Sequence, residues 1–101
     1  MLLYNVTVGI DKEIEEEWII WIKTYHIPSV MQTGLFVDSK MYKILHDQDD
    51  GSISYSIQYF AKSINNVTQY LQNFAPAIIE EHRKKFADKH VVFQTLLEEV
   101  E

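Results

Sequence analysis

The chain has 101 residues and a mass of 11.9 kDa, and 47% of its residues are apolar. A chain of this size buries one hydrophobic core and is too short for two, so we expect a single domain over residues 1–101. The net charge is −6, from 9 basic and 15 acidic side chains, and the basic ones are scattered along the chain. Such a surface repels a phosphate backbone, which argues against nucleic acid as a partner.

The chain contains no cysteine. This excludes disulfides and thiolate chemistry and fits a reducing compartment, so we expect a cytoplasmic protein. The longest unbroken apolar run, residues 18–22, is far shorter than the ~20 residues that a membrane span requires. The N-terminal residues lack the basic stretch of a secretory signal, so we expect them to belong to the fold and no membrane to be involved.

Residues 2–10 alternate with the period of a half-buried strand, and the larger apolar side chains fall on one side. Asp11 can cap the helix that follows, and several glutamates crowd its first turns, where a helix favours negative charge. The apolar positions of this helix recur at helical spacing at Ile14, Trp18, Trp21, Ile22 and Tyr25. We expect Trp18 and Trp21 to anchor the core.

Pro28 removes a backbone donor and disfavours a helical conformation in the residue before it, so we predict an interruption at residues 25–28. A short second helical turn then begins at Pro28 and ends at Gly34. Residues 35–47 and 52–61 are predicted to be two strands. The sequence Asp49-Asp50-Gly51 between them favours a tight hairpin, because an Asp-Gly pair readily adopts positive φ angles.

The next helix has Ser63 or Asn65 as its cap, and its apolar face is formed by Ile64, Val67, Tyr70, Leu71 and Phe74. Ala75-Pro76 breaks or kinks this helix, after which Ile79, His82 and Phe86 continue an apolar stripe. Residues 90–98 are predicted to be the last strand.

The predicted order is strand, helix, strand, strand, helix, strand. This order indicates an α+β, ferredoxin-like βαββαβ fold with a four-stranded antiparallel sheet and both helices on one face. The opposite face, called the open face below, is then either wet or covered by something outside the chain. We expect it to carry Leu3, Asn5, Thr7, Ser54, Ser56, Gln58 and Phe60 from the central strands, and Phe36, Asp38, Lys40, Tyr42, Ile44, His46, Val92, Gln94 and Leu96 from the outer ones.

This predicted face has small polar groups at its centre and apolar or aromatic groups around them, unlike a water-facing sheet. Two such faces packed around a two-fold axis would enclose a lumen with an apolar rim and a polar interior, so we expect a homodimer. The alternative is a monomer with a mixed exposed face, because single apolar residues are common on protein surfaces.

Four segments carry a resemblance over essentially the whole chain: Leu3-Tyr4-Asn5-Val6-Thr7-Val8, the Trp18, Trp21 and His26-Ile27-Pro28 region, residues 55–60 and residues 92–97. Together they resemble an uncharacterised bacterial family, the domain of unknown function numbered 4286. The layout is similar to the dimeric α/β-barrel superfamily, whose members pair ferredoxin-like sheets face to face. That superfamily includes cofactor-free monooxygenases, isomerases, haem enzymes and ligand-sensing domains, so the resemblance implies a cavity without a defined chemistry.

His26 is the most suggestive single residue, because imidazole titrates near neutral pH and this one lies beside a predicted helix end. It is a candidate general base or ligand hydrogen-bond donor, or it only interacts with carbonyls at the helix C-terminus. A polar set is predicted to converge on the lumen and bind a ligand: Asn5, Thr7, Ser54, Ser56 and Gln58, with Tyr42 as a phenolic donor. Alternatively, these side chains face solvent or bond across the dimer.

We expect no metal and no cofactor. His46, His82 and His90 are scattered, HExxH is absent, and the three glycines lie too far apart for a phosphate-binding loop. A metal site assembled only by folding is the alternative.

Three functions fit these observations. The first is a homodimer that binds a small, largely apolar molecule in the lumen. The second is a cofactor-free isomerase or oxygenase with His26 as general base and Asn5 or Gln58 orienting the substrate. The third is a structural or protein-interaction dimer with no ligand. The sequence does not decide whether the protein is an enzyme.

Overall fold

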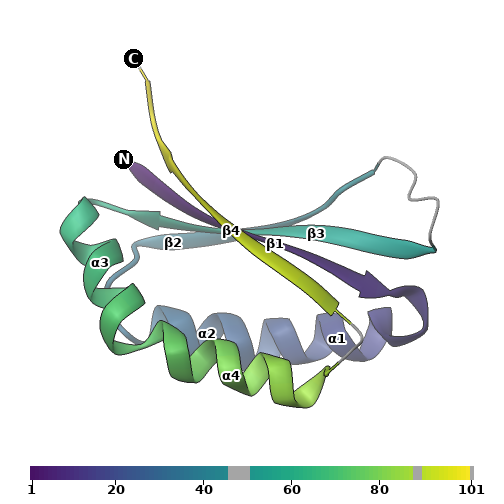
Figure 1. Ribbon diagram of the computed structural model, residues 1–101. Coiled ribbons are helices and arrows are strands. Elements are labelled where there is room, and N and C mark those ends of the chain that lie inside the picture. The colour runs from purple at the N-terminus through teal and green to yellow at the C-terminus, as the bar shows by residue number, and fades with distance from the viewer. Residues whose placement is uncertain (46–50, 88–89, 101) are drawn as a thin grey trace.

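The computed structural model describes residues 1–45, 51–87 and 90–100. Its sheet is antiparallel with the strand order β2-β3-β1-β4. The strands are β1 (Leu2–Asp11), β2 (Asp38–Lys43), β3 (Ser52–Ala61) and β4 (His90–Glu98). All the described helices lie on one side of this sheet, and no helix or strand of the described residues covers the other side (Figure 1). The predicted ferredoxin-like arrangement is therefore confirmed.

The two central strands, β1 and β3, pair along their whole length, with Val6 opposite Ile57. Because residues directly opposite in an antiparallel pair point to the same face, this register places the alternating apolar side chains of both strands toward the helices, as predicted. β2 pairs with β3 but is shorter than predicted. Gly51 has a φ of +76°, as an Asp-Gly turn requires. Asp49 and Asp50 of the predicted turn lie outside the described residues.

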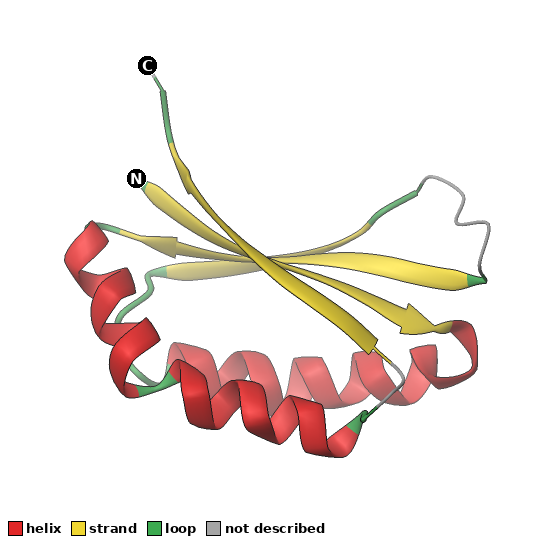
Figure 2. Cartoon of the chain, in the orientation of Figure 1, coloured by secondary structure: helices red, strands yellow, loops and turns green. Residues whose placement is uncertain are grey.

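The first helical region is continuous where we predicted an interruption (Figure 2). After a 3₁₀ turn at Lys12–Ile14, it runs through α1 (Glu15–Trp21), a π-helical segment (Ile22–His26) and α2 (Ile27–Met31). A proline in an α-helix removes one hydrogen bond and clashes with the carbonyl four residues earlier. The wider π-helical turns directly before α2 change the hydrogen-bond register, so the helix passes Pro28 without ending.

The second helical region is broken as predicted. α3 (Ile64–Asn73) ends before Phe74, and α4 (Ala75–Lys85) begins with a proline in its first turn. The side chain of Ser63 caps α3 by accepting a hydrogen bond from the Asn66 backbone N–H at 3.3 Å. Asp11 makes no such bond with its side chain. No described helix has both the length and the apolar character needed to cross a membrane.

The core lies between the sheet and the helices and is rich in aromatic rings. Trp18 is fully buried, whereas Trp21 is half-buried among the rings of Tyr25, His26 and Phe86. Of the face predicted for α3, only Val67 and Tyr70 are buried. The remaining core residues are Tyr4, Val8, Ile10, Ile22, Val30, Phe36, Tyr55, Ile57, Tyr59, Ala61, Ala75, Ile78 and Phe86.

Candidate functional site

The polar residues predicted for the site do share the open face. In the β1–β3 pairing, Asn5 lies opposite Gln58 and Thr7 lies opposite Ser56. In the β2–β3 pairing, Tyr42 also lies opposite Ser56. The central side chains bond to one another: Ser56 Oγ donates to Asn5 Oδ1 at 2.6 Å, Asn5 Nδ2 donates to Thr7 Oγ1 at 2.9 Å, and Gln58 Nε2 donates to Ser56 Oγ at 3.3 Å. Ser54 lies on the same face, opposite Gly9. Their hydrogen-bonding capacity is thus partly used within the chain.

The prediction for the outer strand β4 was wrong. Val6 pairs with Gln94, Val8 with Val92 and Tyr4 with Leu96, so these β4 residues face the helices. The open face instead receives Val91, Phe93, Thr95 and Leu97. Both faces of this strand carry apolar residues, so its sequence pattern does not identify the inward face. Only the pairing with β1 determines which face is inward.

Phe36 was also predicted on the open face and is instead buried on the helix side. Its ring packs against those of Tyr4, Tyr59 and Tyr70, with centroids 6.1, 5.4 and 5.1 Å apart. The reason is that β2 begins only at Asp38, so the strand alternation does not extend back to this residue. Asp38, Lys40 and Tyr42 do face outward, as their pairing shows. His46 lies outside the described residues.

His26 lies on the other side of the sheet from this polar set. It ends the π-helical segment, and its ring packs against Trp21 and His82 with centroids 5.5 and 5.8 Å apart. The sheet therefore separates His26 from Asn5 and Gln58. These residues do not form one active site, contrary to the arrangement that the enzyme hypothesis required.

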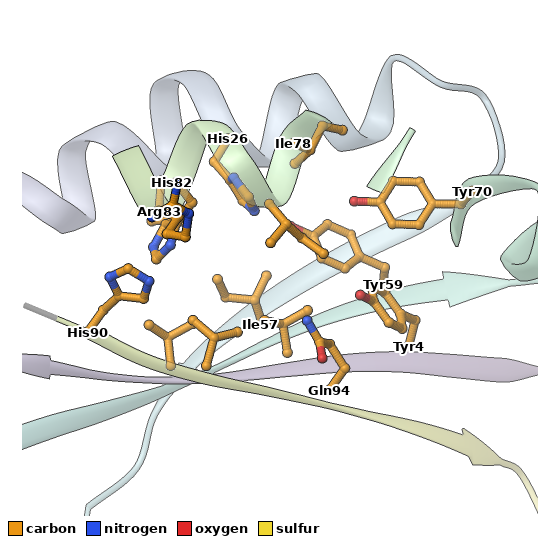
Figure 3. Close-up of a pocket in the computed structure, with 15 residues that line it drawn as sticks. Tyr4, His26, Ile57, Tyr59, Tyr70, Ile78, His82, Arg83, His90 and Gln94 are labelled. Carbon is orange, nitrogen blue, oxygen red and sulfur yellow. The ribbon is translucent and has the colours of Figure 1, made fainter. Parts of the chain in front are cut away.

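The residues around His26 enclose a pocket of about 260 Å³ between the sheet and the helices, which we call the helix-side pocket (Figure 3). It is lined by Tyr4, Val6, Val8, Ile22, His26, Ile57, Tyr59, Tyr70, Ile78, Ile79, His82, Arg83, His90, Val92 and Gln94. Aliphatic side chains form its middle, and polar groups gather at its two ends. A cavity of roughly 150 Å³ is enough to hold a benzene ring, so this pocket has room for a substituted ring.

One end of the pocket is formed by three imidazoles and is called the histidine end: His26, His82 and His90. The rings of His82 and His90 are 4.5 Å apart between centroids. His82 Nε2 accepts a hydrogen bond from Trp18 Nε1 at 2.9 Å, so its own proton is on Nδ1. His90 Nδ1 lies 2.7 Å from the carbonyl oxygen of Phe86, to which it donates.

Burial keeps two imidazoles of the histidine end uncharged. It lowers the pKa of His26 to about 4, although the carboxylate of Glu81 acts in the opposite direction. Burial also lowers the pKa of His82 to about 3, and the neighbouring His90 and His26 lower it further. Both of these imidazoles are therefore neutral at pH 7.

The other end is formed by the phenol rings of Tyr4, Tyr59 and Tyr70 and is called the tyrosine end. Figure 3 shows these rings converging at the opposite end of the pocket from the imidazoles. Burial raises the pKa of all three hydroxyls, so they stay protonated and can donate hydrogen bonds.

Tyr59 is the unusual member of this group. Its side chain is 1% exposed, and its hydroxyl has no hydrogen-bond partner among the described residues. A buried polar group without a partner costs about 1–3 kcal/mol, so native proteins contain few of them. Because Tyr59 lines the pocket, this hydroxyl is a candidate donor to a polar atom of a ligand bound there.

Arg83 also lines the pocket, with a side chain that is exposed to solvent. Its guanidinium is held by Glu80, with Nε 2.9 Å from Oε2. Gln94 reaches in from the edge strand β4. Within the described part of the chain, no group of three histidine or acidic side chains is placed to hold a metal ion.

Sequence reasoning found His26 but missed the other polar residues of the pocket. Tyr59 and Tyr70 were assigned to the core by their spacing, and His82 was read as part of an apolar stripe. A histidine at a core position of α4 was a usable signal, since a buried imidazole needs a partner. His90 gave no such signal in the sequence, because only the register of β4 against β1 turns it toward the helices.

The fold and pocket together define a ferredoxin-like α+β protein, and solved structures agree. A dimeric ferredoxin-like protein from an uncultured marine organism matches with a TM-score of 0.71 and 12% identity, covering 100% of this chain and 96% of that one. An ethyl tert-butyl ether D (EthD) family protein from Bacillus halodurans matches with a TM-score of 0.68 and 15% identity, covering 99% and 100%. Hydroxynitrile lyase from Passiflora edulis matches with a TM-score of 0.59 and 15% identity, covering 98% and 95%.

The chain belongs to the family described as "Domain of unknown function (DUF4286)", which it matches over residues 1–100. This confirms the resemblance stated from the sequence. No curated protein matches the chain. The structural neighbours share its fold at low identity, so they specify no activity for it.

Proposed function

We propose that this protein binds a small, neutral, largely apolar molecule in the helix-side pocket. The observation that carries the proposal is the buried Tyr59 hydroxyl, which has no partner among the described residues and belongs to a side chain that lines a cavity large enough for a substituted ring. A ligand that accepts a hydrogen bond from Tyr59 would remove the cost of burying this donor. The pocket thus differs from the lumen between two sheets that the sequence analysis favoured.

The charge state of the pocket supports a neutral ligand. The imidazoles of His26 and His82 are neutral and the phenols are protonated at pH 7, and the guanidinium of Arg83 is already held by Glu80. Burying a carboxylate without a partner is costly. We therefore expect a neutral ring with a carbonyl or hydroxyl oxygen, with its ring against the aliphatic middle.

The test is isothermal titration calorimetry with three compounds of similar shape: acetophenone, cumene and benzoate. We expect acetophenone and cumene to bind and benzoate to bind much more weakly. The Tyr59→Phe variant should bind acetophenone roughly tenfold more weakly, which corresponds to one hydrogen bond, and cumene with unchanged affinity. Tyr42→Phe, on the open face, is the matched control and should change neither. If neither neutral compound binds at millimolar concentration, the proposal is wrong.

The second candidate is an enzyme that moves a proton with His26. A neutral imidazole lining an apolar pocket favours it, and one structural neighbour is a hydroxynitrile lyase. However, a general base works best when its pKa lies near the working pH, and a pKa of about 4 makes His26 a weak one. Binding therefore ranks first. If a catalysed reaction is found, unchanged turnover in His26→Ala would remove His26 from the mechanism.

We also propose that the protein is a homodimer that pairs through the open face. Val91 and Phe93 are 70% and 58% exposed there, and Tyr42 is exposed on the other side of the polar centre. The central polar groups already bond to one another, so covering them costs little. The charged side chains Asp38 and Lys40 have opposite signs, which suits contact between identical copies. One structural neighbour is a dimeric ferredoxin-like protein.

A further inference from the structure

A mostly apolar groove of about 380 Å³ adjoins the helix-side pocket. The two cavities share Tyr4, Ile79 and Gln94. The groove continues outward between β4 and the ends of α3 and α4, and its further lining residues are Leu71, Ala75, Pro76 and Leu96. We call it the outer groove. Because three residues line both cavities, the groove borders the pocket directly beside Gln94.

The lining of the outer groove is mostly apolar, and none of the described residues that line it is charged. Leu71, Ile79 and Leu96 come from three different elements, and each is about two-fifths exposed to solvent. Large apolar side chains that converge on one surface from separate elements are typical of a binding surface, whereas scattered ones are common everywhere. The acidic and basic side chains of α4 do not line the groove.

The outer groove lies on the helix side of the sheet. Leu96 pairs with Tyr4 and faces the helices, whereas the next residue, Leu97, pairs with Leu3 and belongs to the open face. Pairing of two copies through the open face would therefore leave the groove accessible to a ligand.

We propose that the ligand of the helix-side pocket carries a hydrocarbon chain that lies in the outer groove. This rests on the proposed function and adds the chemical class: an elongated, uncharged amphiphile whose ring and oxygen lie inside and whose alkyl chain extends between β4 and α4. The adjacency of the two cavities and the uncharged lining of the groove select this occupant over a charged or polar tail.

The experiment is a calorimetric titration with alkyl phenyl ketones from acetophenone to octanophenone, at concentrations where each ketone is monomeric. Burying one methylene contributes enough free energy to raise affinity about fourfold. We therefore expect the association constant to rise by about that factor for each added methylene until the groove is filled. Leu96→Ser and Leu71→Ser, at residues that line the groove but not the pocket, should flatten this rise and leave the affinity for acetophenone itself unchanged.

Leu97→Ser is the matched control, because Leu96 and Leu97 are both 45% exposed on the same strand and differ in the face they occupy. It should retain the full dependence on chain length. If acetophenone binds and longer chains add nothing, the groove is not a tail site, and the proposed function stands. If the dependence on chain length is the same in Leu96→Ser as in the wild type, the proposal is also overturned.

Two further outcomes are informative. If no ketone binds at all, the proposed function fails together with this inference. If Leu96→Ser changes the sedimentation of the ligand-free protein, the groove is a contact between protein chains, and the tail assignment is overturned.

Discussion

Removing the Tyr59 hydroxyl should make the ligand-free protein more stable, although most substitutions of buried residues destabilise a protein. Tyr59→Phe keeps the ring and its packing against Tyr4 and Phe36, at 6.2 and 5.4 Å between centroids, and removes only the oxygen. Because that oxygen has no partner among the described residues, its removal recovers the cost of burying it, about 1–3 kcal/mol. For a domain of this size, each kcal/mol corresponds to roughly 4–8 °C in Tm.

Tyr55→Phe is the matched comparison, because Tyr55 is also a buried tyrosine on the same face of β3. Its hydroxyl donates to the carboxylate of Glu15, which also pairs with Lys43 at 3.1 Å. Removing this hydroxyl loses a hydrogen bond to a charged group and should cost about 1–3 kcal/mol. Both substitutions remove one phenolic hydroxyl. Opposite changes in the free energy of unfolding would therefore isolate the effect of the missing hydrogen-bond partner.

The assay is urea unfolding followed by circular dichroism, with the free energy of unfolding compared at a common m-value. We expect Tyr59→Phe to be more stable than the wild type and Tyr55→Phe to be less stable. A loss of stability in Tyr59→Phe comparable to that in Tyr55→Phe would refute the reasoning, since it would mean that the Tyr59 hydroxyl is bonded within the protein.

Three further predictions follow from the structure. The free energy of unfolding should fall as the pH decreases from about 6.5 to 4, because His26 and His82 take up a proton near pH 6.5 in the unfolded chain but only at about pH 4 and pH 3 in the folded one. In urea titrations, His26→Leu should reduce the slope of this free energy against pH by up to about 1.4 kcal/mol per pH unit. An unchanged slope would contradict the burial of His26 in a neutral form. Trp18→Phe should lower the free energy of unfolding by about 2–4 kcal/mol, because it leaves His82 Nε2 without its donor and opens a small cavity. Trp21→Phe, at a half-buried position, should lower it less. Equal losses of stability in thermal unfolding would argue against the Trp18–His82 bond. In sedimentation equilibrium, Phe93→Glu should shift the protein from a dimer toward an 11.9 kDa monomer. Leu96→Glu, on the other face of β4, should cause no such shift. A wild type that already sediments as a monomer would exclude the proposed interface.

The sequence alone predicted the order of the elements, the faces of β1 and β3 and the break before α4, because each depends on short-range pattern. Alternation with a period of two identifies the inward side of a central strand, and Ala75-Pro76 interrupts a helix through its own backbone chemistry. The same local reasoning failed at Pro28, because a π-helical segment at Ile22–His26 accommodates the proline and the local pattern of the sequence contains no sign of it.

Only the tertiary structure determined where the candidate site is. Both alternating sets of β4 contain large apolar residues, so the inward set is fixed by hydrogen-bond register with β1 and not by composition. That register turns His90, Val92 and Gln94 toward the helices, where His26 and His82 lie on two segments far apart along the chain. The residues of this pocket lie far apart along the sequence, so long-range packing brings them together. The spacing of residues within one segment does not predict such packing.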